Sequence, residues 1–85
     1  MSVAVHQTPN PNARKFVLAE KRFAMPRSFP VSTPADDPLA VRLLALDGVY
    51  NVFMAQDFVT INKLPDVAWE PLEAAVTEIL TEYQA

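Results

Sequence analysis

The stretch Val49–Lys63 reads VYNVFMAQDFVTINK and decides the fold. Two six-residue runs rich in β-branched and aromatic residues flank the three residues 55–57, which predicts an antiparallel hairpin. In the second run Val59 and Ile61 alternate with polar residues and should face the core. The first run has three consecutive apolar residues at 52–54, so we expect either a β-bulge there or partial cover on both faces of the sheet.

A helix is expected on each side of this hairpin. Before it, Asp37 is a candidate N-cap, and Pro38 takes the first helical position, where its missing N–H costs nothing. Gly48, the only glycine of the chain, should end this helix in the left-handed conformation. After the hairpin, a helix should begin near Trp69, because the apolar residues that follow share one helical face. Those residues are Leu72, Ala75, Val76, Ile79, Leu80 and Tyr83.

The N-terminal half predicts strands at residues 3–7 and 15–19. Within 20–35 three prolines exclude a regular helix, so we expect an extended segment with a short pairing at a sheet edge. The large apolar residues of this segment should be buried; they are Phe23, Met25, Phe29 and Val31. The element order predicts a single domain over residues 1–85 with an α+β, ββαββα-like fold. In it a small, mainly antiparallel sheet carries two helices packed on one face.

The composition argues against catalysis and metal binding. The 85 residues contain no cysteine, and His6 is the only histidine, so neither a thiolate site nor a histidine pair can form. One glycine cannot make a glycine-rich phosphate loop. The candidate nucleophiles Ser28, Ser32 and Thr33 lie on the proline-rich segment, with no base placed beside them. We therefore predict a protein that is not an enzyme and has no cofactor or metal.

Nothing in the chain predicts export or membrane insertion. No apolar run approaches the roughly 20 residues needed to span a bilayer. The first residues lack the cationic start and the long apolar stretch of a signal peptide. We therefore expect a soluble, cytoplasmic protein without a membrane partner.

Charge is distributed unevenly between the two halves. Residues 1–34 carry five cations and one anion, whereas residues 35–85 carry two cations and nine anions. The basic half could fold against the acidic half, or it could attract an anionic partner. Its cations alternate with phenylalanines, as in proteins that bind single-stranded nucleic acid. The net charge of −3 and the need for these phenylalanines in a small core argue against nucleic-acid binding.

The loop Thr8-Pro9-Asn10-Pro11-Asn12 should be stiff and polar. Proline fixes φ and disfavours helix at the preceding residue, and asparagine tolerates turns. The loop could be a structural corner whose side chains bond their own backbone, or it could be a recognition surface. In the second case the candidate partner-binding residues are Thr8, Asn10, Asn12, Arg14 and Lys15. Trp69 could similarly be an exposed anchor for a partner, but a wedge between helix and sheet is the favoured interpretation.

Five parts of the sequence form a pattern when they are taken together. They are Thr8-Pro9-Asn10-Pro11-Asn12 with Lys15-Phe16, Pro38-Leu39-Ala40, Asp47-Gly48-Val49 with Val52-Phe53, Asp57-Phe58-Val59-Thr60, and Trp69-Glu70. This pattern resembles the N-terminal domain of Nfu/NifU-type iron–sulfur cluster scaffold proteins and covers nearly the whole chain. The resemblance implies a ββαββα-like domain, which in that family precedes a separate C-terminal domain whose Cys-X-X-Cys pair binds the cluster.

The cluster-binding residues of that family have no positions to be carried onto, because the chain has no cysteine. The resemblance therefore implies an accessory role, in which the domain docks onto proteins of iron–sulfur cluster assembly or their targets. We expect a non-catalytic protein-interaction module that does not itself bind the cluster. Binding of nucleic acid or another anion through the basic N-terminal half is the alternative.

Overall fold

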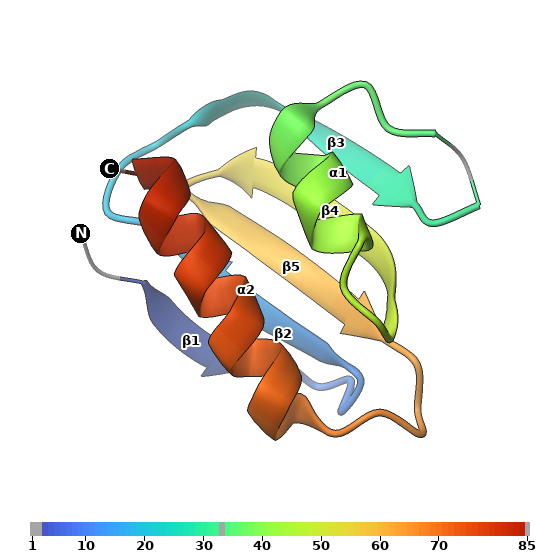
Figure 1. The fold of residues 1–85 in the computed structure, drawn as a ribbon. Helices are drawn as coiled ribbons and strands as arrows, with labels where there is room; N and C mark the ends of the chain where they lie inside the picture. The colour runs from blue at the N-terminus through green and yellow to red at the C-terminus, as the bar shows by residue number, and fades with distance from the viewer. Residues whose placement is uncertain (1–2, 33, 85) are drawn as a thin grey trace.

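The computed structural model describes residues 3–32 and 34–84, and within them the chain forms five strands and two helices. In chain order they are β1 (Ala4–Gln7), β2 (Ala13–Val17), β3 (Phe23–Pro30), α1 (Pro38–Leu44), β4 (Val49–Gln56), β5 (Phe58–Lys63) and α2 (Trp69–Gln84). The strands form one antiparallel sheet in the order β1-β2-β5-β4-β3, and both helices lie on the same face of it (Figure 1). The predicted α+β, ββαββα-like fold is confirmed, with β3 as an additional strand at the sheet edge.

The β4–β5 hairpin forms as predicted and brings the core residues of both strands into register. Val52 pairs with Ile61, and Met54 pairs with Val59. All four side chains are buried on the face that the helices cover. The core-facing orientation predicted for Val59 and Ile61 is therefore confirmed.

The consecutive apolar residues at 52–54 do not form a bulge. Their pairing with β5 is regular, and the irregularity in β4 lies between Val49 and Asn51. Because neighbouring strand residues point to opposite faces, Phe53 faces away from the helices, where it is half-buried. Its ring centroid lies 6.1 Å from that of Phe58. Partial cover on both faces, the second of the two alternatives, accounts for these residues.

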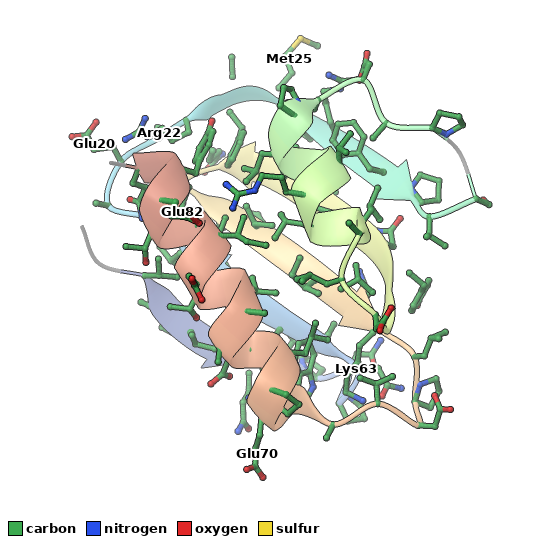
Figure 2. All side chains as sticks on the ribbon, viewed as in Figure 1. Glu20, Arg22, Met25, Lys63, Glu70 and Glu82 are labelled. Carbon is green, nitrogen blue, oxygen red and sulfur yellow. The ribbon has the colours of Figure 1, made fainter. Side chains whose placement is uncertain are left out.

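The proline-rich segment contains a full edge strand, β3, which pairs with β4. Proline is tolerated there because an edge strand has one side without a ladder partner. Phe29 is buried as predicted, but Met25 is 73% exposed and Val31 is 55% exposed, so the prediction that both are buried was wrong. The register shifts between Phe23 and Arg27, so Met25 lies in an unpaired stretch and points away from the fold (Figure 2). Val31 follows the last paired residue of the strand.

Helix α1 begins where the sequence predicts and ends earlier than predicted. The Asp37 carboxylate accepts hydrogen bonds from the backbone N–H groups of Leu39 and Ala40, which confirms it as the N-cap. The helix ends with Ala45 as its C-cap, in a right-handed conformation. Gly48 does have a positive φ of +95°, but it lies in the turn that leads into β4. The positive φ is confirmed, and the role as helix cap was wrong.

Helix α2 starts at Trp69, as predicted, and lays its apolar face on the sheet. Leu72, Val76 and Leu80 are buried, and full burial of such a side chain stabilises a fold by about 1.5–3 kcal/mol. Near the end of the helix, the Tyr83 ring stacks on Phe23 of the edge strand with centroids 6.2 Å apart. No helix within residues 3–32 and 34–84 is long and apolar enough to cross a bilayer.

Candidate functional site

The Thr8–Asn12 loop is closed by hydrogen bonds within itself. The Thr8 hydroxyl lies 2.9 Å from the carbonyl oxygens of both Asn10 and Ala13, and it accepts from the backbone N–H of Asn10 at 3.2 Å. Oδ1 of Asn10 accepts from the backbone N–H of Asn12 at 2.9 Å. The Ala13 N–H donates to the Asn10 carbonyl at 3.0 Å. These side chains therefore shape the corner between β1 and β2, as asparagine and threonine do in many turns.

Two residues from a distant part of the chain hold this loop from outside. Lys63 lies at the end of β5 (Figure 2). Its Nζ donates to Oδ1 of Asn12 at 3.1 Å and to the carbonyl of Leu64 at 3.2 Å. Nε1 of Trp69, at the start of α2, donates to the carbonyl of Pro11 at 2.9 Å. Lys63 is only 5% exposed, and a buried ammonium needs hydrogen-bond acceptors. The structural-corner interpretation of the loop is thus supported at both of its asparagines.

Arg14 reaches from β2 to α2 and completes this cluster. Its guanidinium forms an ion pair with Glu73 and lies 5.0 Å from the centroid of the Trp69 ring. Nζ of Lys63 lies 5.7 Å from the same centroid. Both separations fit cation–π attraction. Trp69 is half-buried and packs against the hydrophobic core, which confirms the interpretation of this residue as a wedge.

The five residues predicted to bind a partner do not form one continuous surface. Lys15 neighbours Arg14 in β2, so its side chain points to the opposite face of the sheet, where Nζ lies 4.4 Å from the ring centroid of Phe58. Three of the five, Thr8, Asn10 and Arg14, line a pocket of about 220 Å³ beside the loop, which we call the loop pocket. The fourth, Asn12, is bonded to Lys63, as described above. Their role in partner binding stays a prediction.

The basic half of the chain folds against the acidic half. Of the three ion pairs among the described residues, Arg14–Glu73 and Arg27–Asp36 join the two halves, and the Arg27–Asp36 distance is 2.6 Å. The third, Arg42–Glu82 at 2.9 Å, joins the two helices. The pairs of Arg27 and Arg42 are at least half exposed, so each contributes at most about 1 kcal/mol.

The phenylalanines that alternate with cations belong to the core. Phe16 and Phe29 are buried, so their faces are not available to stack on bases. Phe23 is half-buried against Tyr83. The alternation with cations therefore no longer supports nucleic-acid binding.

The residues that could act in catalysis lie far apart. His6 is exposed on β1, and Ser28 lies on β3, at the opposite edge of the sheet. The Ser28 hydroxyl donates to Oδ1 of Asn51 at 3.2 Å. Ser32 is exposed beyond the end of β3, and Thr33 lies outside the described residues. Within residues 3–32 and 34–84, no three His, Cys, Asp or Glu side chains are grouped so that they could hold a metal ion.

Lys63 is the residue that the sequence interpretation missed. It ends the alternation Val59, Ile61, Lys63, whose members all face the helices. That spacing was available as a signal, since a strand residue two positions after a buried one faces the same side.

Comparison with known proteins finds relatives that share this fold. Residues 3–85 match the family described as "Scaffold protein Nfu/NifU N terminal". NifU-like protein 5, mitochondrial, from Arabidopsis thaliana is 33% identical over 98% of this chain and 31% of its own length. NFU1 iron-sulfur cluster scaffold homolog, mitochondrial, from Homo sapiens is 32% identical over 100% of this chain and 35% of its own length. The chain thus spans about a third of the length of these relatives.

A solved structure gives the same result. The crystal structure of protein SAV1430 from Staphylococcus aureus superposes with a TM-score of 0.81 at 25% identity, covering 93% of this chain and 98% of that one. Its match extends over both helices and the sheet, because so little of either chain is left out. Taken with the family match over residues 3–85, this shows that the chain belongs to the Nfu/NifU N-terminal family, which is related to iron–sulfur cluster scaffold proteins.

Proposed function

We propose that this chain is a non-catalytic interaction module that serves iron–sulfur cluster assembly by binding assembly proteins or their targets, without holding the cluster itself. The observation that carries the proposal is the absence of cysteine from all 85 residues of a chain in this family. Iron–sulfur clusters are held by cysteine thiolates, in some cases with histidine, and this chain offers one histidine and no thiolate. The cytoplasmic location predicted from the sequence is part of the proposal and is tested by fractionating the source cells.

The loop pocket is the first candidate for the binding surface. Its loop is fixed by its own hydrogen bonds and by Trp69 and Lys63, so a partner would not have to order it. Asn10 is exposed, and among the hydrogen bonds of the described residues none uses its Nδ2 group. That amide and the cation of Lys15, which lies on the opposite face of the sheet, are therefore the predicted site residues that a partner could contact without disturbing the fold.

Two conservative substitutions separate binding from folding. Asn10→Asp keeps the Oδ1 acceptor for the N–H of Asn12 and removes the free amide donor. Lys15→Met keeps an apolar stem over the Phe58 ring and removes the charge. Both variants should melt within about 2 °C of the parent, since neither creates a cavity or a buried unpaired group. Glu78→Gln, an exposed change on α2, is the matched control.

The test is quantitative affinity purification from the source cells with the parent chain, the double variant Asn10→Asp/Lys15→Met, and the control as bait. Proteins of iron–sulfur cluster assembly or their targets should be enriched with the parent and the control and lost with the double variant. Equal enrichment with all three baits would show that the partner binds a surface that does not include Asn10 and Lys15. If none of the three baits enriches such proteins, the proposed function is wrong.

Nucleic-acid binding, the alternative function, is tested by gel retardation of labelled single-stranded RNA and DNA. Contacts between cations and phosphates strengthen as salt is lowered, so a protein that binds nucleic acid must retard the labelled strand at low ionic strength. We expect no retardation there, because Phe16 and Phe29 are buried and two cations of the basic half are ion-paired.

A further inference from the structure

The α1–β4 turn, the β5–α2 connection and the first turns of α2 lie toward the same end of the molecule (Figure 1). Residues of these three segments line an apolar groove. It has a volume of about 350 Å³ and is open to solvent. Apart from Asp47, its lining is apolar or glycine: Leu46, Gly48, Val67, Pro71, Leu72 and Ala75. Its size is at the small end of the range for ligand pockets, which suits one large side chain of a partner better than a whole small molecule.

The walls of the groove are tied together by the backbone. The N–H of Leu64 donates to the carbonyl of Gly48 at 2.8 Å, and the N–H of Val67 donates to the carbonyl of Leu64 at 3.1 Å. Gly48 allows this close approach, because a Cβ built on it would lie 2.7 Å from both Cγ atoms of Val67. The groove is therefore preformed, and Leu64 beside it leaves 46% of its surface exposed.

One acidic side chain lines the groove and two more directly precede lining residues, and none of the three is in an ion pair among the described residues. Asp47 lines the groove, and Asp66 and Glu70 directly precede the lining residues Val67 and Pro71. All three acids are exposed, and none belongs to the ion pairs found among residues 3–32 and 34–84. Figure 2 shows Glu70 pointing away from the fold into solvent.

The surrounding sequence strengthens this charge imbalance. From residue 43 to the end of the chain, Lys63 is the only lysine or arginine. Its side chain is buried and donates a hydrogen bond to Asn12. An apolar groove whose lining segments carry acids outside any ion pair is complementary to an apolar side chain flanked by cations.

We propose that this groove, the acidic groove, receives a basic segment of a partner protein. One large aliphatic or aromatic side chain of that segment enters the groove, and lysines or arginines on either side of it face Asp47, Asp66 and Glu70. The inference rests on the proposed interaction role but uses a surface separate from the loop pocket. A second copy of the chain is disfavoured as the occupant, because the acidic ends of two copies repel each other.

The experiment titrates the ¹⁵N-labelled chain with a synthetic peptide and follows its amide resonances. The probe is an acetylated, amidated peptide Gly-Lys-Lys-Leu-Phe-Lys-Lys-Gly. Two control peptides replace all lysines by glutamate, or Leu and Phe by serine. We expect saturable shifts at residues 46–48 and 64–75 with the lysine peptide, weaker at high salt, and no saturable shifts with either control.

Matched variants test the two parts of the groove. The triple variant Asp47→Asn/Asp66→Asn/Glu70→Gln should weaken binding about tenfold, since three surface charge pairs are lost, whereas Glu78→Gln should change it by less than about twofold. Ala75→Leu fills the groove and should abolish the shifts while the spectrum stays that of a folded protein. Equal binding of the serine peptide, shifts confined to residues 8–15, or no shifts at millimolar peptide would overturn the proposal.

Two outcomes separate this inference from the proposed function. If the lysine peptide does not bind but the variant Asn10→Asp/Lys15→Met still loses its partners, the proposal for the acidic groove is wrong and the proposed interaction role stands. If sedimentation of the chain alone shows self-association that Ala75→Leu removes, the occupant is a second copy, and the proposal of a partner protein is wrong.

Discussion

The ammonium of Lys63 donates a 3.1 Å hydrogen bond to Oδ1 of Asn12, which lies 51 residues earlier in the chain. This bond joins the β1–β2 loop to the end of β5, and the bond from Trp69 to Pro11 joins the same loop to α2. The loop is therefore part of the folded framework and also the edge of the loop pocket. Any test of binding at the loop has to leave these two bonds intact.

Replacing Asn12 by alanine should destabilise the protein strongly for a loop substitution. It removes an acceptor from a buried ammonium, and hydrogen bonds to charged groups contribute about 1.5–3 kcal/mol. The free energy of unfolding in urea should fall by about that amount. Asn12→Asp keeps the acceptor and should be at least as stable as the parent. If both variants lose the same free energy of unfolding, the Asn12 side chain does not stabilise the protein through its hydrogen bond with Lys63.

Replacing Trp69 by phenylalanine tests the second attachment of the loop. The apolar wedge is largely kept, but the carbonyl of Pro11 loses its donor, at a cost of about 1 kcal/mol. Amide hydrogen exchange of residues 10–13 should speed up more than that of residues 76–80 in the core of α2. Uniform acceleration across the chain would indicate a global packing loss instead.

Replacing Gly48 by alanine should be costly for two reasons. The residue has φ of +95°, and the new Cβ would lie 2.7 Å from Val67. We expect a loss of about 1–3 kcal/mol in the free energy of unfolding. In a double-mutant cycle, Val67→Ala should remove the share of this loss that comes from the steric clash with Val67. The share that comes from the positive φ of residue 48 should remain. Strict additivity of the two changes would contradict the close approach.

Replacing Asp37 by alanine should remove the N-cap of α1. Its carboxylate accepts from two backbone N–H groups, at 2.9 and 3.2 Å, and loss of such a cap costs about 0.5–2 kcal/mol. Asp37→Ser retains a capping oxygen and should recover most of that loss. Asp36→Ala removes an exposed ion pair and should change the melting temperature much less.

The features that were predicted correctly have signals within a few residues of sequence. The hairpin follows from alternation at Val59 and Ile61, and the start of α1 follows from Asp37 next to Pro38. The first residue of α2 follows from the apolar periodicity after Trp69. In each case a local preference and the burial of one face agree, so the tertiary structure had nothing to override.

The features that were missed depend on pairing between distant segments. The alternation Val59, Ile61, Lys63 places Lys63 on the core face, but the acceptor that its buried ammonium needs comes from Asn12 in a distant segment. Arg14 is separated from Lys15 because pairing with β5 extends β2 back to Ala13, and neighbouring strand residues point to opposite faces. Met25 was expected inside because it is apolar, but the register shift in β3 leaves it unpaired and exposed. The end of α1 was misplaced because Gly48 does not cap the helix; its missing side chain allows Val67 to pack closely against it.

Anaerobic reconstitution with ferrous iron and sulfide tests the central claim most directly, namely that this chain acts by binding proteins and does not hold a cluster. Iron and sulfide per chain would be measured after desalting, alongside a cysteine-free control protein. The account predicts no more retained iron or sulfide than the control, because no thiolate is present. A stable coloured protein with iron and sulfide in fixed proportion to the chain would contradict it.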